Sequence, residues 1–202
     1  MHTATGTPID PALVAGARGG SESARAALYT ALATGVFTLV RRILGSESLA
    51  EDVLQDTFVE VFTKLEELRD DAAIAGWVRR IAVNRALSHL RSSWVSKRVD
   101  WAPEDFQALA SATVPHSDCA RLEAALDALP HTARAVVWLY DVEGYTHQEI
   151  ADLMGRSVSF SKSRLSRAHA SLREYLGANY RSADIEIANE GTELCVGRLK
   201  TI

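Results

Sequence analysis

Basic and hydroxyl side chains gather on one side of a helix that we predict over residues 157–176. The other side is mostly apolar at the spacing of about 3.6 residues per turn, which suits packing against a core. Lysine and arginine bind phosphates and hydrogen-bond guanine edges in the major groove of duplex DNA. This pattern predicts a duplex-DNA contact. The candidate contact residues are Arg156, Ser159, Lys162, Ser163, Arg164, Ser166 and Arg167.

The segment before this helix predicts a helix-turn-helix. Thr146 is followed three residues later by Glu149, the spacing of a capping box, and we expect a helix over 146–154. Gly155 tolerates the positive φ of a tight turn, and Ser157 can cap the next helix. Such a unit places its second helix in a major groove. A plain helical hairpin with a solvated basic face is the alternative.

A second group of residues could bind unpaired bases. This group lies on a helix predicted over 72–93, on a side away from the apolar arc that contains Val83, Leu87 and Leu90. Aromatic rings stack on bases, amides hydrogen-bond base edges and arginines neutralise phosphates, which suits single-stranded DNA. The alternative, which the spacing leaves open, is a tryptophan in the core and solvated arginines. The candidates are Trp77, Arg80, Asn84, Ser88 and Arg91.

The charges of the chain are segregated, although its net charge is −4. Residues 71–98 contain six Lys or Arg against one Asp, and residues 155–173 contain five Lys or Arg and no acid. Residues 99–118, between them, contain four acids and no Lys or Arg. Two basic patches on either side of an acidic stretch predict two nucleic-acid contacts joined by a linker. Two solvated helix faces are the alternative.

Helical periodicity accounts for most of the chain, and no segment before residue 180 alternates convincingly as a strand. A helix over 23–44 should end at Gly45, and Ser48 with Glu51 should cap a second helix that runs to about residue 68. Further helices are expected over 72–93, 121–129, 132–142, 146–154 and 157–176. The predicted fold class is therefore all-α, with two small helical domains joined by a flexible linker.

This organisation predicts five segments. They are a loose N-terminal arm over 1–23 with one helical turn near 11–17, a helical domain over 24–98, an acidic linker over 99–118, a second helical domain over 119–177 and a C-terminal extension over 178–202. The extension alternates apolar and polar residues around Asn189-Glu190-Gly191, so it is either a β-hairpin or disordered.

Composition excludes several classes of protein. Two cysteines, Cys119 and Cys195, are too few for a disulfide framework, so a reducing cytoplasm is expected. The longest weakly polar run, residues 26–40, is interrupted by hydroxyl side chains and is shorter than the roughly 20 apolar residues that cross a bilayer. The N-terminus lacks the features of a signal peptide. We therefore expect a soluble intracellular protein.

No residue pattern predicts an enzyme. His116 and Cys119 are spaced like two zinc ligands, but no second pair with suitable spacing follows. The glycines of residues 16–20 are not followed by the Gly-Lys-Ser/Thr of a phosphate-binding loop, and no nucleophile–base pair stands out. We expect no catalytic residue, no metal and no cofactor.

Three stretches of the sequence resemble one protein family. They are LAEDVLQDTFVEVF, AGWVRRIAVNRALSHLRS and LDALPHTARAVVWLYDVEGYTHQEIADLMGRSVSFSKSRLSRAHASLR. In this order they are similar to the extracytoplasmic-function sigma factors of bacterial RNA polymerase, with region 2 in the first two stretches and region 4 in the third. The resemblance covers roughly residues 24–176. It implies a non-enzymatic subunit that binds core RNA polymerase, melts the −10 element with residues 24–98 and recognises the −35 element with residues 119–177.

The resemblance also implies roles for individual residues. Asn84 takes the position expected to contact a flipped −10 base, and Arg79, Arg80 and Arg91 would hold the DNA backbone. The basic face of the 157–176 helix would recognise the duplex −35 element. The residues that the resemblance implies for binding the clamp helices of the largest polymerase subunit are Asp52, Gln55, Asp56, Phe58 and Glu60. The three acids among them step by four along one helix face and form the stripe that a basic coiled coil would attract.

Two positions depart from the family. Ser88 stands where an acid is frequent, which bears on −10 preference. Ser161 stands where an apolar residue is frequent, and its hydroxyl can bond the carbonyl one turn back. The family further implies a cognate anti-sigma factor that covers one or both domains. It also implies a cytoplasmic location, on the nucleoid when the protein is active and near the membrane when an anti-sigma factor holds it there.

Two other functions stay open. A stand-alone helix-turn-helix regulator would dimerise and bind duplex DNA without polymerase, and the acidic stripe argues against it. An anti-sigma or scaffold protein that mimics sigma surfaces would need neither basic segment, and both segments are present.

Overall fold

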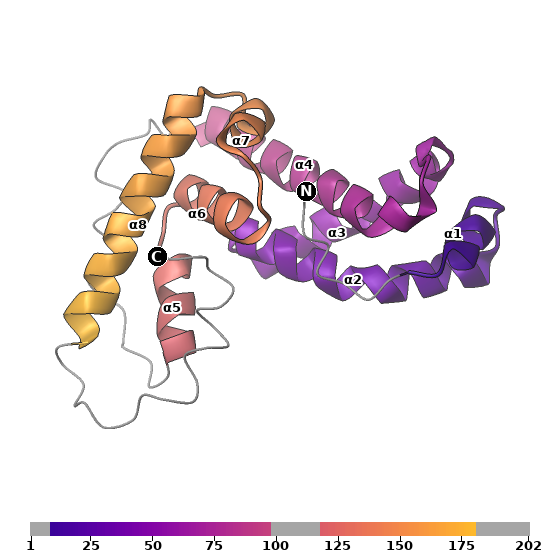
Figure 1. The fold of residues 1–202 in the computed structure, drawn as a ribbon, viewed down its shortest axis with the longest axis horizontal. Coiled ribbons are helices and arrows are strands. Elements are labelled where there is room, and N and C mark those ends of the chain that lie inside the picture. The colour runs from indigo at the N-terminus through magenta and orange to yellow at the C-terminus, as the bar shows by residue number, and fades with distance from the viewer. Residues whose placement is uncertain (1–8, 98–117, 181–202) are drawn as a thin grey trace. The chain divides into compact units, whose positions relative to one another are not determined.

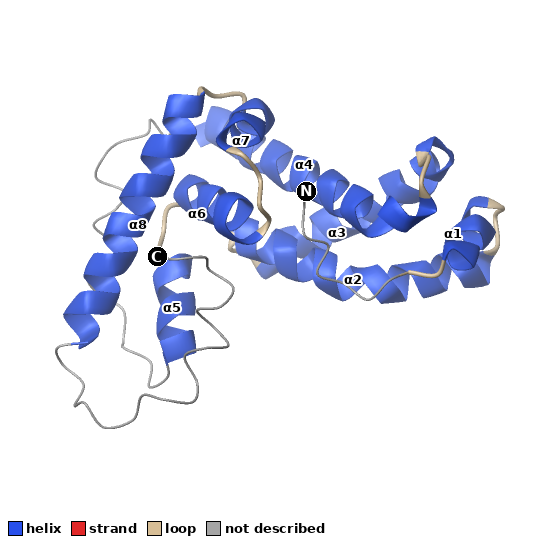
Figure 2. Ribbon diagram, viewed as in Figure 1, coloured by secondary structure: helices blue, strands red, loops and turns tan. Residues whose placement is uncertain are grey.

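The computed structural model describes residues 9–97 and 118–180, and all regular structure in these two ranges is helical (Figure 2). The predicted all-α class is therefore confirmed. The chain divides into two compact units, residues 1–96 and 97–202, which are described one at a time (Figure 1). The predicted linker lies outside the described residues apart from Asp118, and so does the predicted C-terminal extension apart from residues 178–180, which belong to the last helix.

The first unit is a group of helices connected by short turns. Its elements are α1 (Pro11–Arg18), α2 (Glu22–Leu44), α3 (Glu47–Lys64), the 3-10 turns η1 (Leu65–Glu67) and η2 (Asp71–Ala73), and α4 (Ile74–Lys97). α1 lies beside the beginning of α2, and α4 runs along α2 and α3 (Figure 1). Because α3 and α4 carry the predicted docking and −10 residues, their connection decides how the two sets are presented.

Caps define where these helices begin and end. Ser21 accepts a hydrogen bond from the Ala24 amide at the start of α2, and Gly45 ends this helix in the left-handed conformation with φ 68°. The start of α3 differs from the prediction, because Ser46 is its cap and accepts from the Leu49 amide at 3.4 Å. Ser48 therefore lies inside the helix, where a capping role is closed to it.

Residues 11–18 form an eight-residue helix that belongs to the first unit, so the single helical turn predicted near 11–17 is a longer helix packed on the unit and is not part of a loose arm. Asp10 caps α1 and Pro11 occupies its first turn, a combination that favours a helix start. Val14 and Ala17 are fully buried. A Cβ built on Gly16 would lie 3.2 Å from the Cβ of Ala24, which means that α1 and α2 approach closely at this glycine.

α2 is apolar enough to pass for a membrane-spanning helix. It has 23 residues and a mean hydropathy of 1.3 over its most apolar window, so length and composition alone do not exclude a membrane span, contrary to what residues 26–40 predicted. The core helix of a soluble protein passes the same test. Here Leu28, Val36 and Ile43 are buried within the first unit, where α1 and α3 pack on α2.

The second unit contains the predicted helix-turn-helix. Its described elements are α5 (Asp118–Asp127), α6 (His131–Val137), the π-helical turn η4 (Trp138–Val142), α7 (His147–Met154) and α8 (Val158–Tyr180). The single helix predicted over 132–142 is therefore two elements. The wider turn is closed by the Glu143 amide, which donates to the Trp138 carbonyl at 3.0 Å.

A buried arginine fastens the beginning of α6 to the end of α5. Arg134 is 4% exposed, and its guanidinium donates to the carbonyls of Asp127 at 2.8 Å and Leu129 at 3.1 Å. These carbonyls lie where α5 ends and helical partners are missing. The fixed α5–α6 corner supports α8, which packs on both helices.

Candidate docking and nucleic-acid surfaces

The outward side of α3 carries the acids predicted for docking. Asp52, Gln55 and Asp56 are exposed, and the side chain of Asp56 is 65% exposed. Together with Glu60 they form what we term the acidic face. Val59 lies beside them and is 62% exposed, although it is apolar.

Glu60 differs from the other acids of this face because it already has two cationic partners. Its carboxylate accepts from Lys64 Nζ at 2.7 Å and from Arg85 Nε at 2.6 Å. These two hydrogen bonds hold the pKa of Glu60 below its usual range. Arg85 also lies 3.9 Å from Asp56. The sequence grouped Arg85 only with the basic segment of α4, and nothing in the spacing indicated this bridge to α3.

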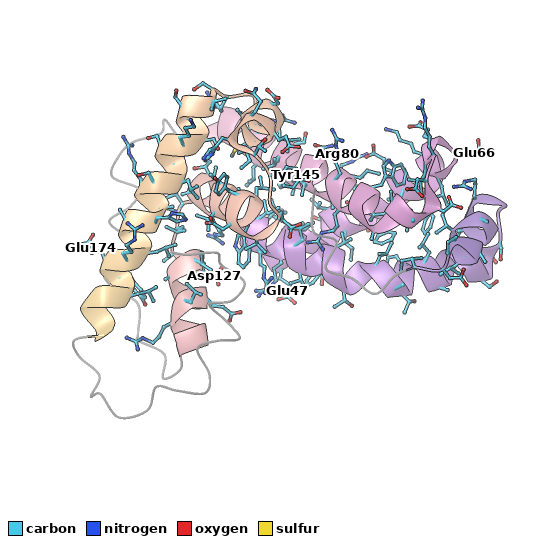
Figure 3. All side chains as sticks on the ribbon, viewed as in Figure 1. Glu47, Glu66, Arg80, Asp127, Tyr145 and Glu174 are labelled. Carbon is cyan, nitrogen blue, oxygen red and sulfur yellow. The ribbon has the colours of Figure 1, made fainter. Side chains whose placement is uncertain are left out.

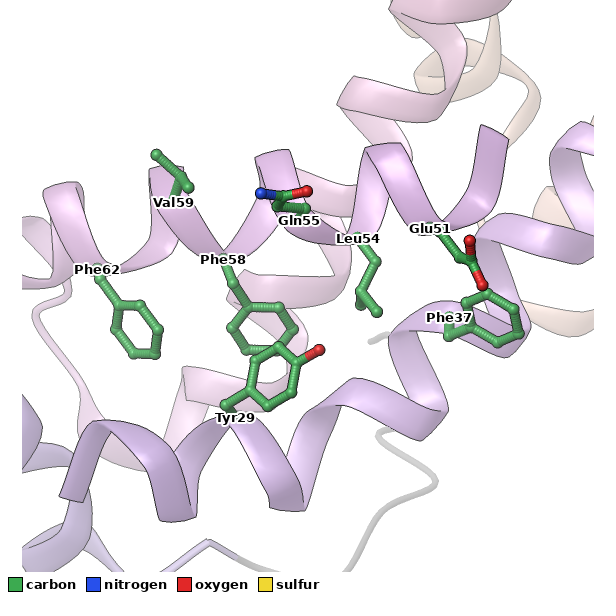
Figure 4. Close-up of a pocket in the computed structure, with 8 residues that line it drawn as sticks. All are labelled: Tyr29, Phe37, Glu51, Leu54, Gln55, Phe58, Val59 and Phe62. Atoms are coloured by element: carbon green, nitrogen blue, oxygen red, sulfur yellow. The ribbon is translucent and has the colours of Figure 1, made fainter. Parts of the chain in front are cut away.

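An apolar groove lies between α2 and α3 next to the acidic face. Its volume is about 560 Å³. Figure 4 shows Leu54, Phe58 and Phe62 pointing from α3 toward α2, where Tyr29 and Phe37 face them. The lining residues are Tyr29, Phe37, Glu51, Leu54, Gln55, Phe58, Val59 and Phe62. Sequence reasoning missed this groove, although Tyr29 and Phe37 stand outside the three- and four-residue steps at which the apolar residues Leu28, Leu32, Val36, Leu39 and Ile43 recur.

Phe58 forms part of the floor of the groove. Its side chain is 3% exposed, and its ring meets Tyr29 edge-on with the centroids 4.6 Å apart. Tyr29 is 42% exposed and therefore offers the more accessible ring. Phe58, predicted as a docking contact, is therefore buried beneath the groove and supports the exposed Tyr29 ring.

Five predicted −10 residues lie on one side of α4. Trp77, Arg80, Asn84, Ser88 and Arg91 follow one another at steps of three or four residues, and we term them the α4 stripe. All are exposed except Trp77, which is half-buried. Figure 3 shows Arg80 on the side of α4 that faces away from α2. The stripe therefore brings together an aromatic ring, an amide and two guanidinium groups.

Arg79 lies apart from the α4 stripe. It is half-buried, and one guanidinium nitrogen lies 4.0 Å from the position that a Cβ on Gly35 of α2 would take. The predicted −10 role of Arg79 is therefore less well supported by its placement than that of Arg80, its neighbour in sequence.

The helix-turn-helix has the capping pattern that the sequence predicted. Thr146 Oγ1 accepts from the Glu149 amide at 3.2 Å, and the Glu149 carboxylate accepts from the Thr146 amide at 2.8 Å. Gly155 has φ 63° between α7 and α8. Ser157 accepts from the Phe160 amide at 3.2 Å and caps α8. These local bonds fix the angle at which α8 leaves the turn.

The outward side of α8 carries most of the residues predicted for −35 contacts. This side, which we term the α8 face, is exposed throughout. It consists of Ser159, Lys162, Ser163, Ser166 and Arg167, and we include Arg156, which is exposed in the turn just before the helix. The face offers cations for phosphates and short hydroxyl side chains that let the helix approach base edges.

Arg164 does not belong to the α8 face. It is 6% exposed, and its guanidinium carbon lies 5.4 Å from the centre of the Phe160 ring. Burial within the second unit argues against the DNA contact predicted for Arg164. The reason for this burial is its position at the border between the apolar and basic sides of the helix.

Ser161 joins α8 to α7 through a side-chain hydrogen bond. It is fully buried, and its hydroxyl lies 3.0 Å from Nδ1 of His147, the first residue of α7. The bond to a carbonyl one turn back, expected for this departure from the family, is replaced by this contact. Tyr140 stacks on the His147 ring at 4.3 Å. Burial and the charge of Lys162 lower the pKa of His147 and favour its neutral form.

Among the described side chains, no three His, Cys, Asp or Glu residues lie close enough together to hold a metal ion. His116 and the side chain of Cys119, which have the spacing of two zinc ligands, lie outside the described residues.

Comparison with known proteins places both units in described families. Residues 28–95 match Sigma-70 region 2, and residues 119–172 match Sigma-70, region 4. The chain is 34% identical over 149 residues to the ECF RNA polymerase sigma factor SigE of Mycolicibacterium smegmatis, covering 70% of this chain and 57% of SigE. It is 35% identical over 129 residues to SigM of Mycobacterium tuberculosis, covering 63% of this chain and 64% of SigM.

A third relative matches over nearly its whole length. The RNA polymerase sigma factor CarQ of Myxococcus xanthus is 34% identical over 166 residues, covering 79% of this chain and 93% of CarQ. The match spans less than two thirds of SigE and SigM. The acidic face, the α4 stripe and the α8 face all lie inside the two matched regions, whereas α1 lies outside them.

Proposed function

The chain belongs to the extracytoplasmic-function sigma factors of the sigma-70 family, as its motifs predicted, and from this premise we propose that it is a promoter-specificity subunit of bacterial RNA polymerase. The observation that carries this proposal is the separation of three chemically different surfaces. The acidic face is suited to a basic protein, the α4 stripe to unpaired bases and the α8 face to duplex DNA. Sigma factors are generally non-enzymatic, so the polymerase supplies the chemistry of transcription.

Docking on the polymerase would use the acidic face together with the apolar groove. Asp52 and Asp56 attract a basic coiled coil over a distance and orient it as it approaches. The groove beside them then takes apolar side chains of that coiled coil, since Tyr29 and Val59 are exposed at its edge. Burial of such groups supplies affinity that surface charges alone do not.

Melting of the −10 element would depend on the α4 stripe. Trp77 can stack on an unpaired base, a contact that contributes about 1–3 kcal/mol per base in single-strand-binding proteins. Asn84 can hydrogen-bond the edge of a flipped base, while Arg80 and Arg91 hold the phosphates on either side. These contacts exist only with opened DNA, so they favour the melted promoter over the duplex.

Recognition of the −35 element would depend on the α8 face in a major groove. Lys162 and Arg167 can bind phosphates or guanine edges, and Ser159, Ser163 and Ser166 are short enough for close approach. We assign residues 24–98, with α1 added, to sigma region 2, residues 119–177 to sigma region 4 and residues 99–118 to the linker. The protein would work in the cytoplasm, on the nucleoid when active.

A cognate anti-sigma factor is the natural inhibitor in this scheme. A protein that covers the acidic face or the α8 face would block docking or promoter recognition, and it could hold the sigma factor near the membrane. The second candidate function is a stand-alone helix-turn-helix regulator. It leaves the acidic face and the adjoining groove without a role, which is why we favour the polymerase subunit.

The decisive experiment reverses charge on the acidic face. The double variant Asp52→Arg/Asp56→Arg should lower the affinity for core polymerase more than about a hundredfold, because like charges would then face the basic partner. Glu66→Arg/Glu67→Arg makes the same change in charge on exposed residues of η1 and serves as the control. Binding is measured with purified core polymerase, and run-off transcription reports function.

Each outcome has a clear meaning. Loss of binding in the first variant, with normal binding of the control and unchanged helical content, supports the proposal. Normal binding of the Asp52/Asp56 variant refutes the docking assignment. Promoter binding by the wild-type protein that is unaffected by core polymerase supports the stand-alone regulator instead.

A further inference from the structure

Arg18 connects α1 to a segment about fifty residues further along the chain. Its guanidinium donates to the carbonyl oxygens of Leu65 and Leu68, both at 3.3 Å, and to the carboxylate of Asp71. All three acceptors belong to residues 65–73, which we term the α3–α4 connection. One side chain therefore holds this connection at its beginning, middle and end.

The α3–α4 connection is short and lies between two surfaces with different partners. It follows α3, which bears the acidic face, and leads into α4, which bears the α4 stripe. Leu65 at its start and Ile74 just after its end are buried in the core, at 2% and 1% exposure. Between these anchors the backbone leaves the α-helix, and the Leu65 carbonyl accepts a single long amide bond, from Leu68 at 3.4 Å, so Arg18 supplies a further donor to it and a donor to the Leu68 carbonyl.

Arginine is suited to this task because its planar guanidinium has five donors in a fixed arrangement. The ammonium of a lysine is a single point of charge and cannot reach three separated acceptors in the same way. The end of α1, which bears Arg18, is itself held in place by α2. Arg25 donates to the Ala17 carbonyl at 3.1 Å and so ties the end of α1 to α2, next to the close contact at Gly16.

The contact lies where its loss should loosen the connection without unfolding the unit. The side chains of Arg18 and Asp71 are 30% and 25% exposed, so water can solvate the acceptors when the guanidinium is removed. The buried anchors Leu65 and Ile74 stay in place. What changes is the freedom of residues 66–73 between these anchors, and with it the direction in which α4 leaves the connection.

We propose that Arg18 is a positioning residue for capture of the −10 element. It holds the α3–α4 connection so that the α4 stripe has a fixed orientation relative to the docked acidic face. This inference rests on the proposed function and extends it to α1, which lies outside the residues that match Sigma-70 region 2. Arg18 acts through the connection and touches neither DNA nor polymerase in this scheme.

The test separates base capture from docking and stability. Holoenzyme is assembled from core polymerase and full-length variants, and its affinity for a fluorescent single-stranded −10 oligonucleotide is measured. Arg18→Gln should weaken this affinity by about tenfold, the factor expected when charge-assisted hydrogen bonds that order a segment are lost. Affinity for core polymerase and for a duplex −35 fragment should change less than about twofold.

Three further variants sharpen the result. Arg18→Lys should fail to restore oligonucleotide affinity, because the forked geometry is lost although the charge is kept. Arg41→Gln removes an exposed arginine of α2 and should have no effect. Asp71→Asn leaves the two carbonyl acceptors in place and should weaken capture in the same direction but by less, which keeps the inference testable if Arg18→Gln folds poorly.

Asn84→Ala distinguishes failure of this inference from failure of the proposed function. If Asn84→Ala weakens oligonucleotide binding and Arg18→Gln does not, the positioning role is overturned and the −10 assignment stands. If neither variant weakens it, the −10 assignment fails and the positioning role with it. Equal losses of oligonucleotide, core and −35 affinity in Arg18→Gln would overturn the inference in favour of a general effect on folding.

Discussion

Replacing Ser161 with alanine should weaken the connection between α7 and α8. The serine is fully buried, and its hydroxyl lies 3.0 Å from Nδ1 of His147. A hydrogen bond between neutral groups contributes about 1 kcal/mol net. Alanine fits the apolar side of α8 next to Leu165 and Ala168, and the change removes one oxygen atom, so a cavity adds little. We therefore expect Ser161→Ala to lower the free energy of unfolding of the second unit by about 1 kcal/mol.

A double-mutant cycle isolates the contact between the two side chains. His147→Ala also removes the ring that stacks on Tyr140, so its own cost should be larger, but the coupling energy belongs to the Ser161–His147 pair. Urea unfolding is followed through the fluorescence of Trp138, after the other three tryptophans have been replaced by phenylalanine in every member of the cycle. We expect a coupling energy of about 1 kcal/mol, and a value below about 0.3 kcal/mol would refute the contact.

Two more predictions concern the same unit. Because burial and Lys162 hold the pKa of His147 below its usual 6.5, the unfolded chain binds a proton at a higher pH than the folded chain. The contribution of this group to stability is therefore complete above pH 6.5 and is lost as the pH falls through 6.5 toward the folded pKa. The urea midpoint should decline as the pH is lowered from about 7.5 to about 5. His147→Gln should make that decline smaller. Arg164→Ala should destabilise the unit by about 1–3 kcal/mol, since it loses buried contacts including the one with Phe160, while leaving the selection of −35 sequences unchanged. Lys162→Ala should leave the stability of the unit unchanged and alter the selection of −35 sequences. Thermal unfolding measures stability, and selection from a randomised −35 library measures sequence preference. Two variants that behave alike in both measurements would contradict these roles.

Local signals in the sequence predicted most of the elements that carry the surfaces. The capping box at Thr146, the glycine at 155 and the cap at Ser157 are short-range features, and each was confirmed because its partners lie within a few residues. The same holds for Gly45 at the end of α2. The exception is α3, where Ser46 and Ser48 both precede suitable residues and only the backbone conformation decides between them.

Contacts between distant segments were beyond the reach of periodicity. Arg85 and Arg164 were counted in the basic segments predicted to contact nucleic acid, and Arg18 was assigned no role, yet each has partners in its own unit. A spacing pattern assigns a residue to one side of its own helix, but it does not say which neighbouring helix covers that side. The groove between α2 and α3 was missed for the same reason, since its two walls come from different helices.

Because of Arg85, the proposed docking on α3 would exchange existing ion pairs for new ones. In the free protein Glu60 has two cations within 2.7 Å, and Asp56 has Arg85 at 3.9 Å. A basic partner that binds these acids competes with Arg85, so fewer ion pairs are gained than there are acids contacted. The binding constant should therefore decline less steeply with ionic strength than the three acids of the face would suggest. The guanidinium that is set free belongs to α4, and any gain in DNA affinity that follows must be matched, by thermodynamic linkage, by an equal gain in docking affinity when DNA binds first.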